Sequence, residues 1–138
     1  MKTTKINIET FVSSAGKKVW DCWTKPEHIT QWNFASDDWR CPSAQNDLSV
    51  GGKYSARMEA KDGSFGFDFE ATYDEVIDQK KIAYTMSDGR QAITTFESTA
   101  GVTKIHTVFD AESENPIDMQ RDGWQAILNN FKKYVEGY

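Results

Sequence analysis

The sequence predicts an α+β domain in which a single antiparallel sheet is covered by one long C-terminal helix. Turn-forming dipeptides that end in glycine separate alternating apolar and polar segments through the middle of the chain, as in strands joined by hairpins. A continuous amphipathic stretch then occupies residues 116–138. About 22 residues at 1.5 Å each make a helix of roughly 33 Å, long enough to cross such a sheet. Because a sheet with one apolar face needs a cover, the terminal helix is expected to provide it.

The composition is that of one domain spanning residues 1–138, long enough to bury a proper core. The net charge of -5 and the lack of a Lys/Arg run argue against a nucleic-acid partner. No apolar run approaches about 18 residues, so no membrane-spanning segment is expected. The N-terminus leads into a strand pattern and not into an apolar signal core, which predicts a cytoplasmic protein. Cys22 and Cys41, the only cysteines, are therefore expected to be free thiols.

The first third of the chain predicts a strand and two short helices. The segment Thr4–Phe11 alternates as a strand does. Ser13-Ser14 offers a cap for the first helix, and Pro26–Trp32 is expected to form the second. The segment Asn33–Asn46 has no clear period and is expected to be a long loop, which is more often functional than idle.

The middle of the chain predicts an antiparallel meander. Gly51-Gly52 and Asp62-Gly63 are the first of four turn signals, and a shorter strand is expected before the first of them. Val76 breaks the alternation that runs over Phe65–Tyr73, so a β-bulge is expected near Asp74-Glu75. The predicted strands are Lys53–Ala60, Ser64–Ile77, Lys81–Ser87, Arg90–Ser98 and Val102–Ala111.

The terminal helix is expected to start at Asn115-Pro116, because Asn caps helices and Pro fits the first helical position. Gln120 and Gly123 interrupt its apolar face. One interpretation is that Gly123 lets the helix approach the sheet closely, while Gln120 meets a backbone group. The other is that this half of the helix roofs a ligand cavity. Eight residues share the apolar face at about 100° per residue and are expected to be buried: Ile117, Trp124, Ile127, Leu128, Phe131, Tyr134, Val135 and Tyr138.

Three motifs, in the right order, resemble START-like domains of the Aha type, which are bacterial proteins named after the activator of a heat-shock chaperone ATPase. The start of these domains resembles the segment Val19–Trp32, which reads VWDCWTKPEHITQW. Their next motif resembles Asp47–Lys53, which reads DLSVGGK, and their closing helix resembles Gly123-Trp124 with the apolar residues that follow it. The resemblance runs nearly from end to end.

The resemblance implies the helix-grip fold of the START-like (SRPBCC) superfamily, a curved antiparallel sheet of six or seven strands that grips the C-terminal helix. In many relatives the cavity between sheet and helix binds small apolar ligands, and other members are polyketide cyclases or hydroxylase components. The fold alone does not choose among these functions. We expect a protein that binds a small hydrophobic or amphipathic molecule and needs no cofactor.

The aromatic residues are explained equally well by a packed core and by an apolar pocket, and the resemblance favours the pocket. Gln120 and Tyr84 are expected to orient a polar end of the ligand, and Gly123 to leave it room. The expected apolar walls of the pocket are Trp32, Trp39, Met58, Phe67, Phe69, Trp124 and Ile127.

The sequence carries no signature of a metal site. His28 and His106 are the only histidines, and neither has a Cys or carboxylate at zinc-ligand spacing. Cys41 lies in the predicted loop and would be a reactive thiol only if its pKa were lowered.

Two rivals to simple ligand binding stay open. A cyclase- or lyase-like enzyme would need a converging acid and base in the pocket. Asp68 and Glu70 are paired carboxylates, but alternation points them away from the phenylalanines, towards solvent or towards Arg57 or Lys53. A chaperone-interaction module would need an exposed partner surface. A homodimer also stays open.

Overall fold

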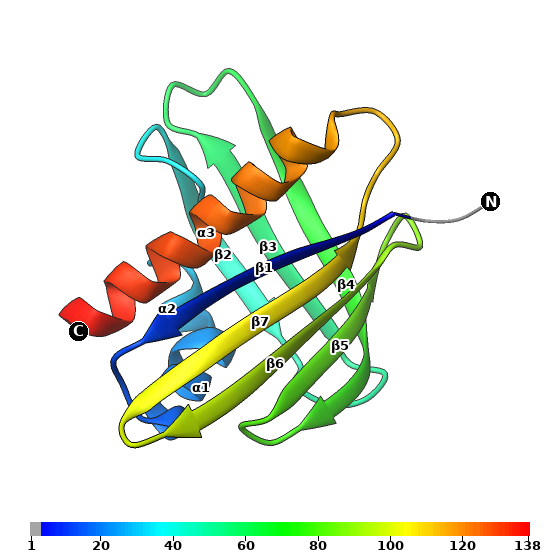
Figure 1. The fold of residues 1–138 in the computed structure, drawn as a ribbon. Coiled ribbons are helices and arrows are strands. Elements are labelled where there is room, and N and C mark those ends of the chain that lie inside the picture. The colour runs from blue at the N-terminus through cyan, green and yellow to red at the C-terminus, as the bar shows by residue number, and fades with distance from the viewer. Residues whose placement is uncertain (1–3) are drawn as a thin grey trace.

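Seven antiparallel strands form one sheet in the order β1-β7-β6-β5-β4-β3-β2 in the computed structural model, which describes residues 4–138. The sheet curls, and the long helix lies across its open side (Figure 1). This confirms the predicted α+β class and the helix-grip arrangement. The strands are β1 (Lys5–Val12), β2 (Trp39–Asn46), β3 (Lys53–Ala60), β4 (Gly66–Ile77), β5 (Lys81–Met86), β6 (Gln91–Thr99) and β7 (Val102–Asp110). The helices are α1 (Gly16–Thr24), α2 (Pro26–Ile29) and α3 (Ile117–Gly137).

The strand predictions from alternation are confirmed. β3 has the predicted bounds, and β1 and β4 to β7 begin and end within two residues of theirs. The register of β4 against β5 shifts between Tyr73 and Glu75, which is the expected bulge. The bulge arises because one extra residue of β4 stands opposite β5, so alternation resumes on the other phase at Val76.

The prediction of a loop over Asn33–Asn46 is wrong for its second half, which is strand β2 at the edge of the sheet. β2 pairs with β3 from Trp39 onwards, but the register shifts between Arg40 and Ser43. Pro42 lies within this irregularity and has no N–H to donate, which an edge strand tolerates. The irregularity removes the clean alternation that marks the other strands in the sequence.

The predicted helix starts are also corrected. The N-cap of α1 is Ala15 and that of α3 is Pro116, and neither end has a side-chain cap. The carbonyl of Ser14 instead accepts a hydrogen bond from the Thr103 hydroxyl at 2.8 Å. The second helix ends at Ile29, three residues before its predicted end, and continues as hydrogen-bonded turns.

The core lies between the concave face of the sheet and the helices. α1 and α2 fill one end of this space, and α3 packs mainly against β1 (Figure 1). The rings of Trp23, Trp32 and Phe131 meet one another with centroids 4.8–5.1 Å apart. The indole N–H of Trp32 donates to the carbonyl of Cys22 at 2.9 Å. These contacts tie all three helical segments together.

The predicted buried face of α3 is confirmed except at its end. Leu128, Phe131 and Val135 are buried, and Ile117, Trp124, Ile127 and Tyr134 pack partly buried against the core. Tyr138 is 67% exposed, because α3 ends at Gly137 and the last ring stacks on Tyr134 instead of entering the core.

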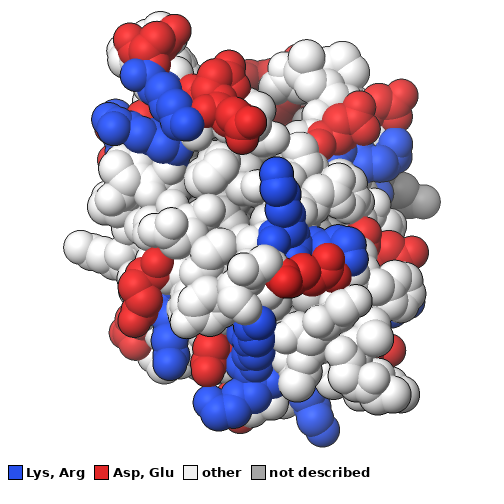
Figure 2. Space-filling model, turned by 90° about the vertical axis from the view of Figure 1, so that its left-hand side faces the viewer, with Lys and Arg blue, Asp and Glu red and all other residues white. Residues whose placement is uncertain are grey.

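The surface carries both signs of charge. On the face that Figure 2 shows, acidic and basic side chains are interspersed, and no continuous basic stripe crosses it. This face therefore offers no track for a phosphate backbone. Among residues 4–138, no helix is both long enough and apolar enough to cross a membrane.

Candidate functional site

A cavity of about 360 Å³ lies between the concave face of the sheet and α3. Its size is at the lower end of the range for small-molecule pockets. Its walls are mainly aromatic, and the rings come from the helical segments and from three neighbouring strands. The aromatic lining consists of Trp23, Trp32, Tyr54, Phe67, Phe69, Tyr73, Tyr84 and Trp124.

Three tyrosines form the centre of the lining because β3, β4 and β5 are neighbours in the sheet. Tyr73 stands directly opposite Tyr84 in the register, with ring centroids 6.3 Å apart. The ring of Tyr54 is parallel to that of Tyr84 at 6.4 Å. Desolvation by burial raises the pKa of all three phenols, so they stay protonated and can donate hydrogen bonds.

The hydrogen bonds of the three phenols differ. The Tyr54 hydroxyl accepts from the Asn33 side-chain amide at 3.0 Å, and the Tyr73 hydroxyl donates to Asn46 Oδ1 at 2.5 Å. The Tyr84 hydroxyl makes no hydrogen bond to any residue of the described chain, and its oxygen is not fully buried. It therefore keeps accessible surface within the cavity, where it can donate to a bound molecule.

The end of the cavity near α1 satisfies its own polar groups. The hydroxyls of Thr94 and Thr107 lie on the neighbouring strands β6 and β7 and share a hydrogen bond of 2.8 Å. Both side chains are buried, and Ile8 and Ile82 line the cavity beside them. This end is consequently mainly apolar, and its two hydroxyls are paired with each other.

Two charged side chains of the described chain line the cavity, close to the start of β6 and the end of β7. Arg90 comes from the turn between β5 and β6, and Glu112 from the segment between β7 and α3. Both are half-buried. They are the groups within the described lining that could interact with a charged part of a ligand.

The α3 side of the cavity is formed by a stacked indole and by aliphatic side chains. The indole of Trp124 stacks on Phe109 at 3.8 Å between centroids and 9° between planes. Phe109 is fully buried, so it fixes the ring that forms this wall. Ile127 and Leu128, one turn further along α3, continue the apolar surface.

The sequence of this domain matches a known family. Residues 15–136 match the family described as Activator of Hsp90 ATPase homolog 1-like protein. The chain belongs to this family. The AHSA1-like assignment agrees with the helix-grip fold of the START-like superfamily and confirms the resemblance found in the motifs.

Solved structures of AHSA1-like and related bacterial proteins have the same fold. The solution structure of the AHSA1-like protein from Aeromonas hydrophila is 42% identical with a TM-score of 0.91, over 97% of this chain and 93% of that chain. Chr148 from Cytophaga hutchinsonii is 47% identical with a TM-score of 0.83, over 96% and 92%. CV1439 from Chromobacterium violaceum is 20% identical with a TM-score of 0.85, over 96% and 98%, and is similar in fold. No curated protein gives a significant match.

Most of the residues that the sequence assigns to ligand binding in this AHSA1-like domain are brought together. Trp32, Met58, Phe67, Phe69, Tyr84, Trp124 and Ile127 all line the cavity. Trp39, Gln120 and Gly123 do not belong to the lining. Trp39, the first residue of the edge strand β2, packs instead against Phe65 and Phe67, with ring centroids 6.0 and 6.2 Å away.

Gln120 and Gly123 do not have the places expected for the roof of the cavity. The Gln120 amide donates to the carbonyls of Glu112 and Asn115 at 3.2 and 2.7 Å and accepts from the Glu112 N–H at 2.9 Å. Its hydrogen bonds therefore hold the segment that leads into α3, as the backbone interpretation predicts. A Cβ on Gly123 would meet nothing within 4 Å, so this glycine does not permit a close approach to the sheet.

Sequence reasoning missed eleven of the eighteen residues in the described lining, including Tyr54, Tyr73, Arg90 and Glu112. Alternation could have found the two tyrosines, because Tyr54 shares a face with Met58 on β3, and Tyr73 shares one with Phe69 on β4. No pattern marks Arg90 and Glu112, which lie outside the strands and reach the cavity only through the tertiary fold.

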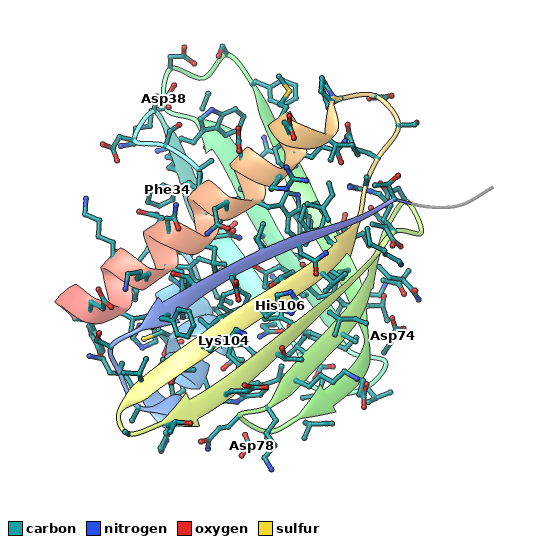
Figure 3. All side chains as sticks on the ribbon, in the orientation of Figure 1. Phe34, Asp38, Asp74, Asp78, Lys104 and His106 are labelled. Atoms are coloured by element: carbon teal, nitrogen blue, oxygen red, sulfur yellow. The ribbon has the colours of Figure 1, made fainter. Side chains whose placement is uncertain are left out.

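The remaining candidates for chemistry lie elsewhere. His106 points to the opposite face of β7 from the buried Ile105 (Figure 3), and its Nε2 is 3.0 Å from Asn7 Oδ1. His28 Nδ1 is 2.6 Å from the Tyr134 hydroxyl. Within residues 4–138, no three His, Cys, Asp or Glu side chains are grouped to hold a metal ion.

The thiols and the paired carboxylates are also accounted for. Cys22 and Cys41 are free and buried, and desolvation raises the pKa of each thiol, which opposes a reactive thiolate at Cys41. Asp68 and Glu70 are exposed, and Asp68 accepts from Arg57 at 3.5 Å, as alternation predicts.

Proposed function

We propose that the cavity binds a small hydrophobic or amphipathic molecule. The observation that carries the proposal is the Tyr84 hydroxyl, a desolvated donor without a protein partner in the described chain, in a cavity whose walls are mainly aromatic and aliphatic. A core that only had to pack would fill this volume, because interiors are normally close-packed. A ligand with an apolar body and one hydrogen-bonding group fits both features.

The test is the binding of N-phenylnaphthylamine, a neutral apolar probe whose fluorescence rises in apolar surroundings. The wild type is expected to bind it. Ile127→Trp places a larger side chain in the cavity and should abolish the signal, while Asn129→Trp adds the same ring to the exposed face of the same helix. A wild type that binds no probe, or an Ile127→Trp variant that binds it as well as Asn129→Trp does, would contradict ligand binding. Native mass spectrometry of the purified protein would identify a co-purified molecule.

A second candidate is a protein contact of the kind suggested by the family description, which names an activator of a chaperone ATPase. The observation that favours it is a group of three aromatic rings, Trp39, Phe65 and Phe67, close to the edge of the sheet that β2 forms. Phe65 is 61% exposed and Phe67 is 40% exposed, and both rings contact Trp39. Such exposed rings are typical of interaction sites. Phe65→Ser should abolish any stimulation of a chaperone ATPase by this protein and leave probe binding unchanged, because Phe65 does not line the cavity.

A further inference from the structure

The charges that line the cavity differ in how well the protein compensates them. Arg90 and Glu112 are the two charged residues in the described lining. Both are half-buried, where charges interact more strongly than in bulk water. If one of them has no opposite charge beside it, a ligand of the opposite sign is favoured at their end of the cavity.

The positive charge of Arg90 is already compensated. Its Nε–H donates to Asp88 Oδ2 at 2.6 Å, and an Nη1–H donates to the carbonyl of Asp110 at 3.5 Å. Burial raises the pKa of Asp88, but hydrogen bonds from Arg90 and its charge lower that pKa overall. The same balance lowers the pKa of Asp110, with Lys5 as its main cationic partner and Arg90 as a further one. Arg90 thus lies next to two ionised carboxylates.

The negative charge of Glu112 is held by neutral donors. Its Oε1 accepts from the backbone N–H of Asn115 at 2.7 Å and from the Asn115 side-chain amide at 2.6 Å. Glu112 forms no ion pair with any residue from 4 to 138. The N-terminus of α3 lies close by, but a helix end supplies only about half of an elementary charge. A net negative charge remains.

The aromatic walls favour the same sign of charge. The faces of Trp, Tyr and Phe rings attract cations through the negative part of their quadrupole. Eight such rings line the cavity, and Tyr54 and Tyr84 lie at its centre. An ammonium group would meet Glu112 at one end of the cavity and aromatic rings along its walls. A carboxylate would meet Glu112 in the lining, beside an Arg90 whose charge Asp88 and Asp110 already compensate.

We infer that the ligand of this cavity is an organic amine, with an apolar or aromatic body between the sheet and α3 and a protonated nitrogen at Glu112. This inference rests on the proposed ligand binding and specifies its chemical class. The Tyr84 hydroxyl oxygen could accept a hydrogen bond from the protonated nitrogen, and the Thr94–Thr107 end would hold the apolar part.

The test compares three molecules that share one body: naphthylethylamine, naphthylethanol and naphthylacetate, each used to displace N-phenylnaphthylamine at neutral pH. The amine should bind at least about fivefold more tightly than the acid. This ratio corresponds to the free energy of one charge interaction at a partly exposed site. Raising the salt concentration should reduce this difference and leave the alcohol unaffected.

Two variants assign the preference to one residue. Glu112→Gln keeps an acceptor for Asn115 and removes the charge, so it should lower the affinity for the amine about fivefold and leave the alcohol unchanged. Glu114→Gln makes the same charge change at an exposed residue outside the lining and should leave all three affinities unchanged.

Three results would overturn the inference: equal or tighter binding of the acid, an amine preference that persists in Glu112→Gln, or an equal loss in Glu114→Gln. The last would mean that the overall negative charge attracts the amine and that Glu112 has no special role. Failure of ligand binding itself has a different signature, because the neutral probe and the neutral alcohol would then fail to bind as well.

Discussion

Gly123 gives the sharpest test of how α3 lies over the sheet. A Cβ built at this position meets nothing within 4 Å, so Gly123→Ala adds a methyl group without steric conflict. Gly in a helix interior is less favourable than Ala by about 1 kcal/mol. The variant should therefore gain about 1 kcal/mol in the free energy of unfolding and melt about 3–5 °C higher, given the length of the chain.

The matched control is Gly52→Ala, the same substitution at a crowded glycine. A Cβ there would lie 2.2 Å from the carbonyl oxygen of Asp47, so the backbone must shift at a cost of about 1–3 kcal/mol. Thermal melts followed by circular dichroism compare the two variants with the wild type. Opposite signs are expected. A Gly123→Ala variant that melts clearly below the wild type would mean that α3 packs closely against its neighbours at Gly123, which would contradict the open space found there.

Three further outcomes follow from the core and its charges. Phe131→Ala should lower the free energy of unfolding by about 3–5 kcal/mol in denaturant titration, because this ring is 0% exposed; a loss below about 1 kcal/mol would contradict its place in the core. The lowered pKa of Asp110 stabilises the fold above the ordinary carboxyl pKa near 4, and this stability is lost as the pH falls through the folded-state pKa. Asp110→Asn should therefore flatten the loss of stability in acid, and an unchanged acid profile would argue against the contact with Lys5. Cys22 and Cys41 should react with a thiol reagent only after unfolding, whereas rapid labelling of the native protein would show that one of them is accessible.

Local pattern predicted the fold well wherever one face of an element is buried continuously. The alternation in β3 to β7 reports directly which side chains meet the core, so their bounds were accurate. β2 was predicted as part of a loop, because Pro42 and the register shift around it interrupt both the alternation and the hydrogen-bond ladder. The start of α3 was misjudged by one residue, because Pro116 is the N-cap and Asn115 belongs to the turn before it, where its side-chain amide donates to Glu112.

The candidate site was predictable in its apolar part and not in its polar part. Met58, Phe67 and Phe69 follow from the sheet face that faces α3, because strand period and hairpin register place them together. Arg90 and Glu112 lie in connections, where no periodicity relates sequence position to direction. Their partners Asp88 and Asn115 are close in sequence, but only the folded chain brings Arg90 and Glu112 together in the lining of one cavity.

The two phenols that face each other across β4 and β5 make the final prediction, because they separate a structural hydroxyl from one available to a ligand. Tyr73→Phe removes the donor to Asn46 Oδ1 and leaves that partly buried acceptor without this partner, which should cost about 1 kcal/mol of stability. Tyr84→Phe removes no described hydrogen bond, so its free energy of unfolding should stay within about 0.5 kcal/mol of the wild type. Binding should show the reverse: Tyr84→Phe weakens naphthylethanol and naphthylethylamine, which can hydrogen-bond to the phenol, but leaves the neutral probe unaffected. If Tyr84→Phe were instead as destabilised as Tyr73→Phe, its hydroxyl would have a structural partner, and the cavity would lose the donor on which the proposed ligand binding rests.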